Sequence, residues 1–266
     1  METLKPIVVK VGTNVVTRKN VREGEPDVLD LNVMGDLAGQ IAQVIDETRR
    51  RVILVSSGAV SAGKSRMRLG NDVDRITAKQ AYAHVGQPLL MSAYDSIFSS
   101  LNPRLIPGQG LLTSNNFDNP TESGRMLKVM ESLPVNVVPV INENDFISTE
   151  ELTFGDNDQL ACHMARLVRA ETIILLTDVD GVFDKDPSQF SDATLLHQID
   201  KADIDSDFLK SCGAGKSANG TGGMKSKLMV AQRAAENGIQ AFIANGKRGN
   251  NLLNIVLRGE GGTKII

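Results

Sequence analysis

The chain has 266 residues, of which 41% are hydrophobic and 23% are charged, as is usual for a globular protein with a sizeable core. A formal net charge of −3 argues against a nucleic-acid-binding surface. No apolar run has membrane-spanning length, and Cys162 and Cys212 do not suggest a disulfide framework, so we expect a cytoplasmic protein without membrane or nucleic-acid partners.

The first half of the chain alternates apolar strands with amphipathic helices. The strands are predicted over residues 5–11, 51–56, 104–113 and 135–141. Helices are predicted from residue 30 to about residue 50, over 77–99 with a break near Gly86 and Pro88, and over 119–132. Residues 17–26 are polar and basic, which indicates an exposed hairpin or loop.

The second half continues the same alternation. Apolar residues at helical spacing from Leu160 to Val168 predict a helix, and residues 172–177 predict a buried strand. A short helix over 201–209, a glycine-rich loop over 217–224, a helix over 227–237, a strand over 239–244 and two short final strands follow. Alternating strands and helices predict an α/β fold with a mainly parallel sheet covered on both faces.

Residues 154–161, FGDNDQLA, place two carboxylates and an amide directly before a predicted helix. One short polar residue is enough to cap a helix, and capping is the simplest interpretation. Here Asp156, Asn157 and Asp158 stand together, and residues 142–145 form a second acidic cluster upstream. We interpret this surplus of polar side chains as part of a site.

Polar residues also follow the other predicted strands. They lie at residues 10–13, 57–59, 142–145, 177–178 and, on a later connection, 220–227. A parallel sheet brings such strand ends to one edge, where two lysines, several carboxylates and two glycine-rich loops would meet. Glycine lets backbone N–H groups approach phosphate oxygens, so this combination is typical of phosphoryl transfer.

One motif leaves an alternative open. Gly58, Gly63, Lys64 and Ser65 match the P-loop pattern GxxxxGK[ST] after a predicted strand, and residues 172–178 could serve as the acidic strand of such an enzyme. A P-loop NTPase or kinase is therefore a competing hypothesis. The structural alternative is a turn of small residues leading into a helix, with Lys64 exposed.

No Ser–His–Asp or Cys–His arrangement is evident, and the three histidines show no metal-ligand spacing. A carboxylate acceptor would need no base, because it is ionised at neutral pH. The obstacle is the approach of one anion to another. Two lysines beside the reacting groups would lower that barrier, since each fixed charge can contribute on the order of 10²–10³ in rate.

Six segments together resemble the amino-acid kinase family. They are KVGT at 10–13, SSGAVSAG at 56–63, VPVINEND at 138–145, FGDND at 154–158, LLTDVDGV at 175–182 and GTGGMKSK at 220–227. Within that family they are similar to the members that phosphorylate the γ-carboxylate of L-glutamate with ATP, the first step of proline biosynthesis. Another member of the family, acting on a related acid, is the alternative.

The resemblance implies a three-layer αβα sandwich in one domain over residues 1–266. Residues 1–160 would form the acid-substrate lobe and residues 161–266 the ATP-binding lobe, with no C-terminal PUA domain. In the family pattern GTGGMxTK a threonine stands where this chain has Ser226, so the hydroxyl is retained. The P-loop match would then be coincidental.

The resemblance also assigns roles to single residues. Lys10, Asp158 and Lys227 would be catalytic, with the aspartate holding both ammonium groups. Glutamate would be bound by Ser57, Gly58, Ala59, Asp145 and Asn157, with Asp145 facing the α-ammonium group. ATP would be bound by Lys10, Thr177, Asp178, Thr221, Gly222, Gly223, Met224, Lys225, Ser226 and Lys227.

The expected partners follow from the same resemblance. ATP would bring Mg²⁺, held mainly by its phosphates, so no direct protein ligand to the metal is predicted. Proline would act as a feedback inhibitor, and the chain would assemble into homodimers or homotetramers. A ligand sensor without turnover is a third hypothesis, but binding alone would not need two lysines and Asp158 in this arrangement.

Overall fold

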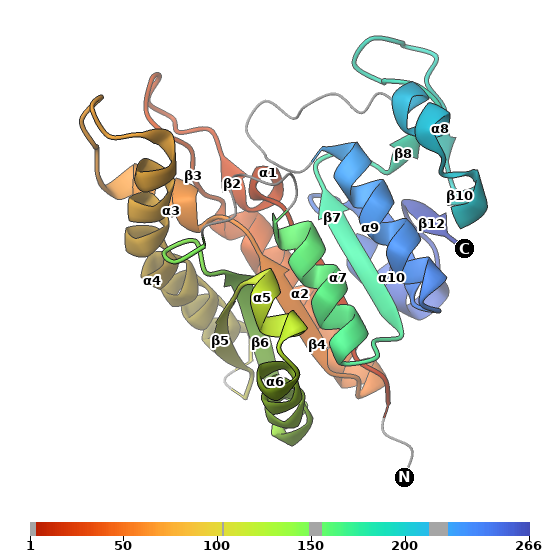
Figure 1. Ribbon diagram of the computed structural model, residues 1–266, viewed down its shortest axis with the longest axis horizontal. Helices are drawn as coiled ribbons and strands as arrows, with labels where there is room; N and C mark the ends of the chain where they lie inside the picture. The colour runs from red at the N-terminus through yellow and green to blue at the C-terminus, as the bar shows by residue number, and fades with distance from the viewer. Residues whose placement is uncertain (1–3, 103, 149–155, 213–222) are drawn as a thin grey trace.

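The computed structural model describes residues 4–102, 104–148, 156–212 and 223–266 (Figure 1). In this part of the chain an eight-stranded sheet has the order β10-β12-β11-β7-β1-β4-β6-β5. Its strands are β1 (Ile7–Val11), β4 (Val52–Ser56), β5 (Ile106–Leu112), β6 (Val137–Glu143), β7 (Thr172–Thr177), β10 (Gln198–Ile199), β11 (Gln240–Asn245) and β12 (Thr263–Ile265). All neighbours from β11 to β5 are parallel, whereas β12 is antiparallel to β11.

Helices cover both faces of the sheet, which confirms the predicted three-layer αβα sandwich. One face is covered by α1 (Thr13–Val16), α2 (Leu31–Thr48), α4 (Arg75–Leu101) and α10 (Asn251–Arg258). The other face, toward the viewer in Figure 1, carries α5 (Ser114–Asp118), α6 (Pro120–Ser132), α7 (Asp156–Leu167) and α9 (Met224–Glu236). No helix among the described residues is long and apolar enough to cross a membrane.

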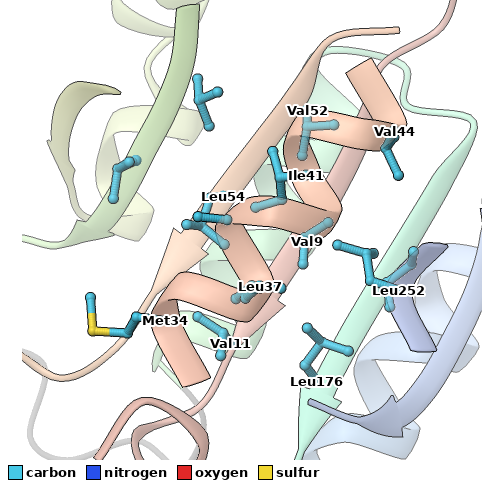
Figure 2. Close-up of a cluster of buried hydrophobic side chains, with 14 of the residues drawn as sticks. Val9, Val11, Met34, Leu37, Ile41, Val44, Val52, Leu54, Leu176 and Leu252 are labelled. Atoms are coloured by element: carbon cyan, nitrogen blue, oxygen red, sulfur yellow. The ribbon is translucent and has the colours of Figure 1, made fainter. Parts of the chain in front are cut away.

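The central strands are buried on both faces, and their side chains alternate between two cores. Val9 and Val11 of β1 pack with Leu37 of α2 and Leu252 of α10 in the first core (Figure 2). Val8, which directly precedes Val9, belongs to the second core under α7 and α9. The period of two along β1 therefore points Lys10 toward the α7 and α9 side.

Short elements complete the fold. β2 (Thr17–Arg18) pairs antiparallel with β3 (Val28–Leu29), which confirms a hairpin around residues 17–26. α3 (Ala59–Arg66) follows β4, and β8 (Val182–Phe183) pairs antiparallel with β9 (Leu195–Leu196). The short helix predicted near residue 205 is a 3₁₀ turn (Lys201–Asp203) followed by α8 (Ser206–Ser211). The division into two lobes at residue 160 stays a prediction.

Two predictions about elements were wrong. α4 continues through Gly86 and Pro88, because α3 packs against it so closely that a Cβ at Gly86 would lie 1.8 Å from the Ala59 carbonyl oxygen. Tertiary packing thus outweighs the weak helix propensity of glycine and proline. Near the C-terminus, one of the two predicted strands is the helix α10, whose Leu252 N–H donates to Gln40 Oε1 at 2.9 Å.

Candidate active site

Three elements bring the charged residues of the site together. Lys10 is the fourth residue of β1, Asp158 is the third residue of α7, and Lys227 is the fourth residue of α9. Because both helices begin at the edge where the parallel strands end, their first turns lie beside the side chain of Lys10. The side chains of the three residues are almost fully buried.

The aspartate bridges the two lysines. Lys10 Nζ lies 2.6 Å from Asp158 Oδ1, and Lys227 Nζ lies 3.2 Å from Asp158 Oδ2. This geometry confirms the predicted convergence of two ammonium groups on one shared carboxylate. Two positive charges and one negative charge leave a net positive charge at the edge of the sheet, where an anion can be bound.

Burial and charge act against each other in this group. Burial lowers the pKa of Lys10, the nearby Asp158 carboxylate partly restores it, and the Lys227 charge lowers it further. For Asp158 burial would raise the pKa, but Lys10 and Lys227 outweigh burial and hold the pKa below its usual range. The aspartate is therefore ionised at neutral pH and acts as a fixed counter-charge.

A cleft of about 350 Å³ opens above the two lysines. It is lined by most of the predicted site residues, namely Lys10, Ser57, Gly58, Ala59, Asp145, Asn157, Asp158, Thr177, Asp178, Gly223, Met224 and Lys227. Lys225 is exposed and Ser226 is buried, and neither lines this cleft. Thr221 and Gly222 lie outside the described residues. The binding roles of all these residues stay predictions.

One side of the cleft is built from neutral hydrogen-bonding groups. Asn157 Nδ2 donates to Ser57 Oγ and to Asn142 Oδ1, each at 2.9 Å. Asn157 Oδ1 accepts from the backbone N–H of Glu143 at 3.1 Å. Asn142 itself lines the cleft, whereas the backbone N–H of Asn144 donates to the Leu112 carbonyl and fixes the loop after β6.

Asp145 has an ion-pair partner that sequence reasoning missed. Its Oδ1 lies 2.8 Å from Lys79 Nζ, and Lys79 also lines the cleft. Lys79 comes from α4, two turns before the predicted break in that helix. A lysine on a long amphipathic helix carries no local signal for a site, because lysines are common on solvent-exposed helix faces.

The opposite side of the cleft lies at the end of β7. Asp178 Oδ2 accepts from Asn14 Nδ2 at 3.0 Å, and Asp178 Oδ1 accepts from the Thr177 hydroxyl at 3.2 Å. Phe183 and residues 186–188 complete this wall and were not among the predicted site residues. Their only signal is the turn after β7, since loops at strand ends are where ligands bind in α/β sheets.

The P-loop alternative is wrong. Gly63 lies in the middle of α3, and a Cβ there would come within 1.9 Å of the Tyr82 carbonyl oxygen, so this glycine serves close packing against α4. Lys64 is exposed above the Tyr82 ring, and the Ser65 hydroxyl donates to the Ala62 carbonyl. Neither Lys64 nor Ser65 lines the cleft, whereas a P-loop needs the lysine at the phosphates and the hydroxyl at Mg²⁺.

Comparisons with known proteins agree with this geometry. The family described as "Amino acid kinase family" matches residues 5–245. The chain is 41% identical over 260 residues to "Glutamate 5-kinase" of Symbiobacterium thermophilum, covering 97% of this chain and 95% of the relative. It is 38% identical over 255 residues to "Glutamate 5-kinase" of Caldanaerobacter subterraneus subsp. tengcongensis, where it covers 96% of this chain and 65% of the relative.

Solved structures show the same fold at low sequence identity. UMP kinase from Bacillus anthracis superposes with a TM-score of 0.65 at 17% identity, over 99% of this chain and 96% of that one. Carbamate kinase from Giardia lamblia bound to AMP-PNP gives a TM-score of 0.67 at 16% identity, over 100% and 99% of the two chains. At these identities the likeness concerns the fold.

Proposed function

The chain belongs to the amino acid kinase family, and on that premise we propose that it transfers the γ-phosphoryl group of ATP to the γ-carboxylate of L-glutamate. The product is γ-glutamyl 5-phosphate, and the step is the first of proline biosynthesis. One observation carries the proposal: Lys10 and Lys227 converge on Asp158 at the base of the cleft. The names of the curated relatives support the choice of glutamate.

The geometry supports this chemistry on electrostatic grounds. A γ-carboxylate oxygen of glutamate attacks the γ-phosphorus of ATP, the bond from phosphorus to the bridging oxygen breaks, and ADP leaves. No proton has to move, because the carboxylate is already ionised. Lys10 would face the phosphoryl group from the acceptor side and Lys227 from the nucleotide side, so both charges oppose the repulsion between the two anions.

Glutamate would lie between the neutral side of the cleft and the Asp145–Lys79 ion pair. Ser57, Asn157 and Asp145 line the cleft, with Gly58 and Ala59 at the start of α3. The Asp145 carboxylate is a suitable partner for the α-ammonium group of glutamate. Lys79, next to Asp145, can form an ion pair with the α-carboxylate. The α-ammonium and α-carboxylate groups of glutamate would thus bind the ion pair of Asp145 and Lys79, each group facing the residue of opposite charge.

ATP would lie on the β7 side, with its phosphates toward the N-terminus of α9. The helix begins at Met224 after Gly223, and its free backbone N–H groups and dipole favour an anion. Thr177 and Asp178 form the wall beside it. The predicted contributions of Thr221, Gly222, Lys225 and Ser226 to ATP binding are part of the same proposal.

The residues present fit a magnesium ion carried by ATP. No group of three or more histidine, cysteine, aspartate or glutamate residues is placed to hold a metal in the described ranges. Mg²⁺ typically uses one or two carboxylates together with substrate phosphates and water, and Asp178 in the cleft could supply one such carboxylate. When bound, the ion would neutralise charge on the β- and γ-phosphates.

Proline inhibition and self-association complete the proposal. Proline shares the α-ammonium and α-carboxylate groups of glutamate, so it would compete at Asp145 and Lys79 and raise the apparent KM for glutamate. Assembly into homodimers or homotetramers would appear as a sedimentation coefficient above that of a monomer. If proline left the apparent KM for glutamate unchanged, the proposed inhibition would be wrong. If the protein sedimented as a monomer, the proposed assembly would be wrong. A cytoplasmic location also stays a prediction.

The most direct test traps the product. The protein is incubated with MgATP, L-glutamate and hydroxylamine, which converts an acyl phosphate into a hydroxamate that forms a coloured complex with Fe(III). We expect hydroxamate with glutamate and none with aspartate, whose acyl phosphate the same assay would detect. Samples without ATP and samples of K10M give the background. Hydroxamate formation that does not depend on glutamate would overturn the proposed substrate.

A further inference from the structure

A chain of amide side chains leads from α4 to the cleft. Asn142 Nδ2 donates to Gln87 Oε1 at 2.9 Å, and Asn157 Nδ2 donates to Asn142 Oδ1 at 2.9 Å. Asn157 Nδ2 also donates to Ser57 Oγ, again at 2.9 Å. Gln87 and Asn142 are buried, with exposed fractions of 8% and 3%. Four residues from four different elements or loops are thus joined in one hydrogen-bonded chain.

A backbone group fixes the direction of this chain. The N–H of Glu143 faces Asn142 Oδ1 at 2.9 Å and Asn157 Oδ1 at 3.1 Å. Since a backbone N–H can only donate, the atoms that face it must be carbonyl oxygens. Turning either amide around would place an NH₂ group against this N–H. The NH₂ group of Asn142 must therefore point to Gln87, which in turn has to offer an oxygen.

The direction of the chain determines what Ser57 can do. Asn157 uses the two hydrogens of its NH₂ group on Asn142 and Ser57, so the Ser57 oxygen is an acceptor of that bond. The hydrogen of the Ser57 hydroxyl has no acceptor among the described residues. Ser57 lines the cleft, and its hydroxyl is therefore set to donate to an acceptor there. A substrate carboxylate is such an acceptor, whereas an ammonium group is not.

Gln87 stands at the far end of the chain and does not line the cleft. Its amide nitrogen is 3.5 Å from Gln109 Oε1, a long and weak contact, so its orientation is determined mainly by the bond to Asn142. Removing the Gln87 oxygen would leave a buried NH₂ group of Asn142 without a partner. A buried donor without a partner is costly, and a rotation of Asn142 would relieve that cost.

We propose that Gln87 is a positioning residue of the acid-substrate site, which acts through Asn142 and Asn157 to present the Ser57 hydroxyl as a donor to a substrate carboxylate. The identity of the substrate as glutamate rests on the proposed function. Because Gln87 does not line the cleft, it affects substrate binding without contacting the substrate. No local sequence signal marks this role, since Gln87 lies inside a long helix.

The first experiment separates positioning from stability. Q87L removes the oxygen at similar volume, and we expect the KM for glutamate to rise about tenfold, with kcat and the KM for ATP within about twofold. Q87E retains an oxygen toward Asn142 and should restore the KM to within about threefold of the original value. Q40L is the matched control, because Gln40 is also buried, accepts from Leu252 N–H between α2 and α10, and does not line the cleft. It should lower Tm and leave the KM for glutamate unchanged.

The second experiment tests whether Gln87 acts through Ser57. If it does, S57A and Q87L are not additive, and Q87L changes the KM for glutamate less than about twofold in the S57A background. Additive effects would overturn the proposal, as would a Q87L protein that is less stable but has an unchanged KM. Both outcomes require a wild-type protein that phosphorylates glutamate. Absence of that turnover would instead overturn the proposed function, and the two failures are therefore distinguishable.

Discussion

The two sides of the cleft are built from different chemistry. At its base, Lys10, Asp158 and Lys227 form a charged group that is nearly inaccessible to water. On the side proposed for glutamate, Ser57 and Asn157 belong to a neutral chain of oriented dipoles. Fixed charges stabilise a transition state in which charge is redistributed. Oriented dipoles can bind a substrate carboxylate without placing another buried ion in the protein. We therefore expect substitutions at the charged base to alter kcat and those on the neutral side to alter KM.

The largest effect is expected for D158N, which keeps the shape of the side chain and removes its charge. Two buried lysines would then face each other without a counter-ion. Loss of one partner from a buried ion pair typically costs about 3–5 kcal/mol in the free energy of unfolding. Denaturant unfolding measures this loss, and the same variant should show little or no turnover.

A surface ion pair provides the control for D158N. Asp192 lies 2.6 Å from Lys185 Nζ, but its side chain is 75% exposed. D192N should therefore lower the free energy of unfolding by less than about 1 kcal/mol. If D158N and D192N lowered the free energy of unfolding equally, the charges would not hold the buried group together. The contrast between the charged base and the neutral side of the cleft would then be wrong.

The next largest effect is expected for K10M and K227M. Each keeps the length of the side chain and removes one of the two ammonium groups, so we expect kcat to fall by about 10²–10³. The KM for glutamate should change little, because neither lysine belongs to the neutral side. K64M serves as the control, since Lys64 is exposed outside the cleft. If K64M lost activity and K10M retained it, the P-loop hypothesis would have to be restored.

Two residues of the charged base could be predicted because each breaks a local rule, whereas Lys227 was indicated by the glycine-rich loop before it and by the family resemblance. Lys10 is a lysine in an otherwise apolar strand, and Asp158 belongs to a polar cluster larger than a helix cap needs. The parallel sheet could also be predicted, because the strands and helices alternate with clear periodicity. These signals are local in sequence, and topology alone brings the strand ends to one edge.

The residues on and behind the side proposed for glutamate could not be predicted in the same way. Gln87 and Lys79 lie on α4, where they resemble any other polar residue of a helix. Their partners lie much later in the chain, in β6 and directly after it. The same helix was expected to break at Gly86 and Pro88. Close packing against α3 keeps it continuous, and this tertiary effect also places Gln87 behind the site. Pairings of this kind become visible only when the fold is known.

A smaller effect is expected on the neutral side itself. S57A removes the hydroxyl that would donate to the substrate carboxylate, and a hydrogen bond to a charged group contributes about 1.5–3 kcal/mol. The KM for glutamate should therefore rise by about tenfold or more, with kcat close to the original value. Steady-state kinetics with glutamate as the varied substrate provide the measurement. S61A on α3 is a matched control on the rim of the same cleft, expected to change KM less. A large fall in kcat for S57A would erase the distinction between the two sides.

The smallest effect is expected in the dependence of activity on pH. Burial lowers the pKa of Lys10, so its ammonium group is lost at a pH below the ordinary lysine value of about 10.4. We expect kcat to fall as the pH rises through this lowered pKa. Stability should respond in the opposite sense. Between the lowered and the ordinary pKa the unfolded chain still holds a proton that the folded protein has released, so the contribution of Lys10 to the free energy of unfolding rises with pH.

K10R separates these two responses from other titrating groups, because its guanidinium stays charged over the whole range. Its residual activity should not fall at alkaline pH in the same way. The difference in the free energy of unfolding between wild type and K10R should change only in the pH window between the lowered pKa of Lys10 and the ordinary lysine pKa. The KM effects at Ser57 should be the same on both sides of the window, because a hydroxyl does not titrate there. A wild-type kcat that stays constant up to the ordinary lysine pKa would show that Lys10 is less desolvated than its burial indicates. The charged base would then differ from the neutral side in its residues, but not in how far those residues are removed from water.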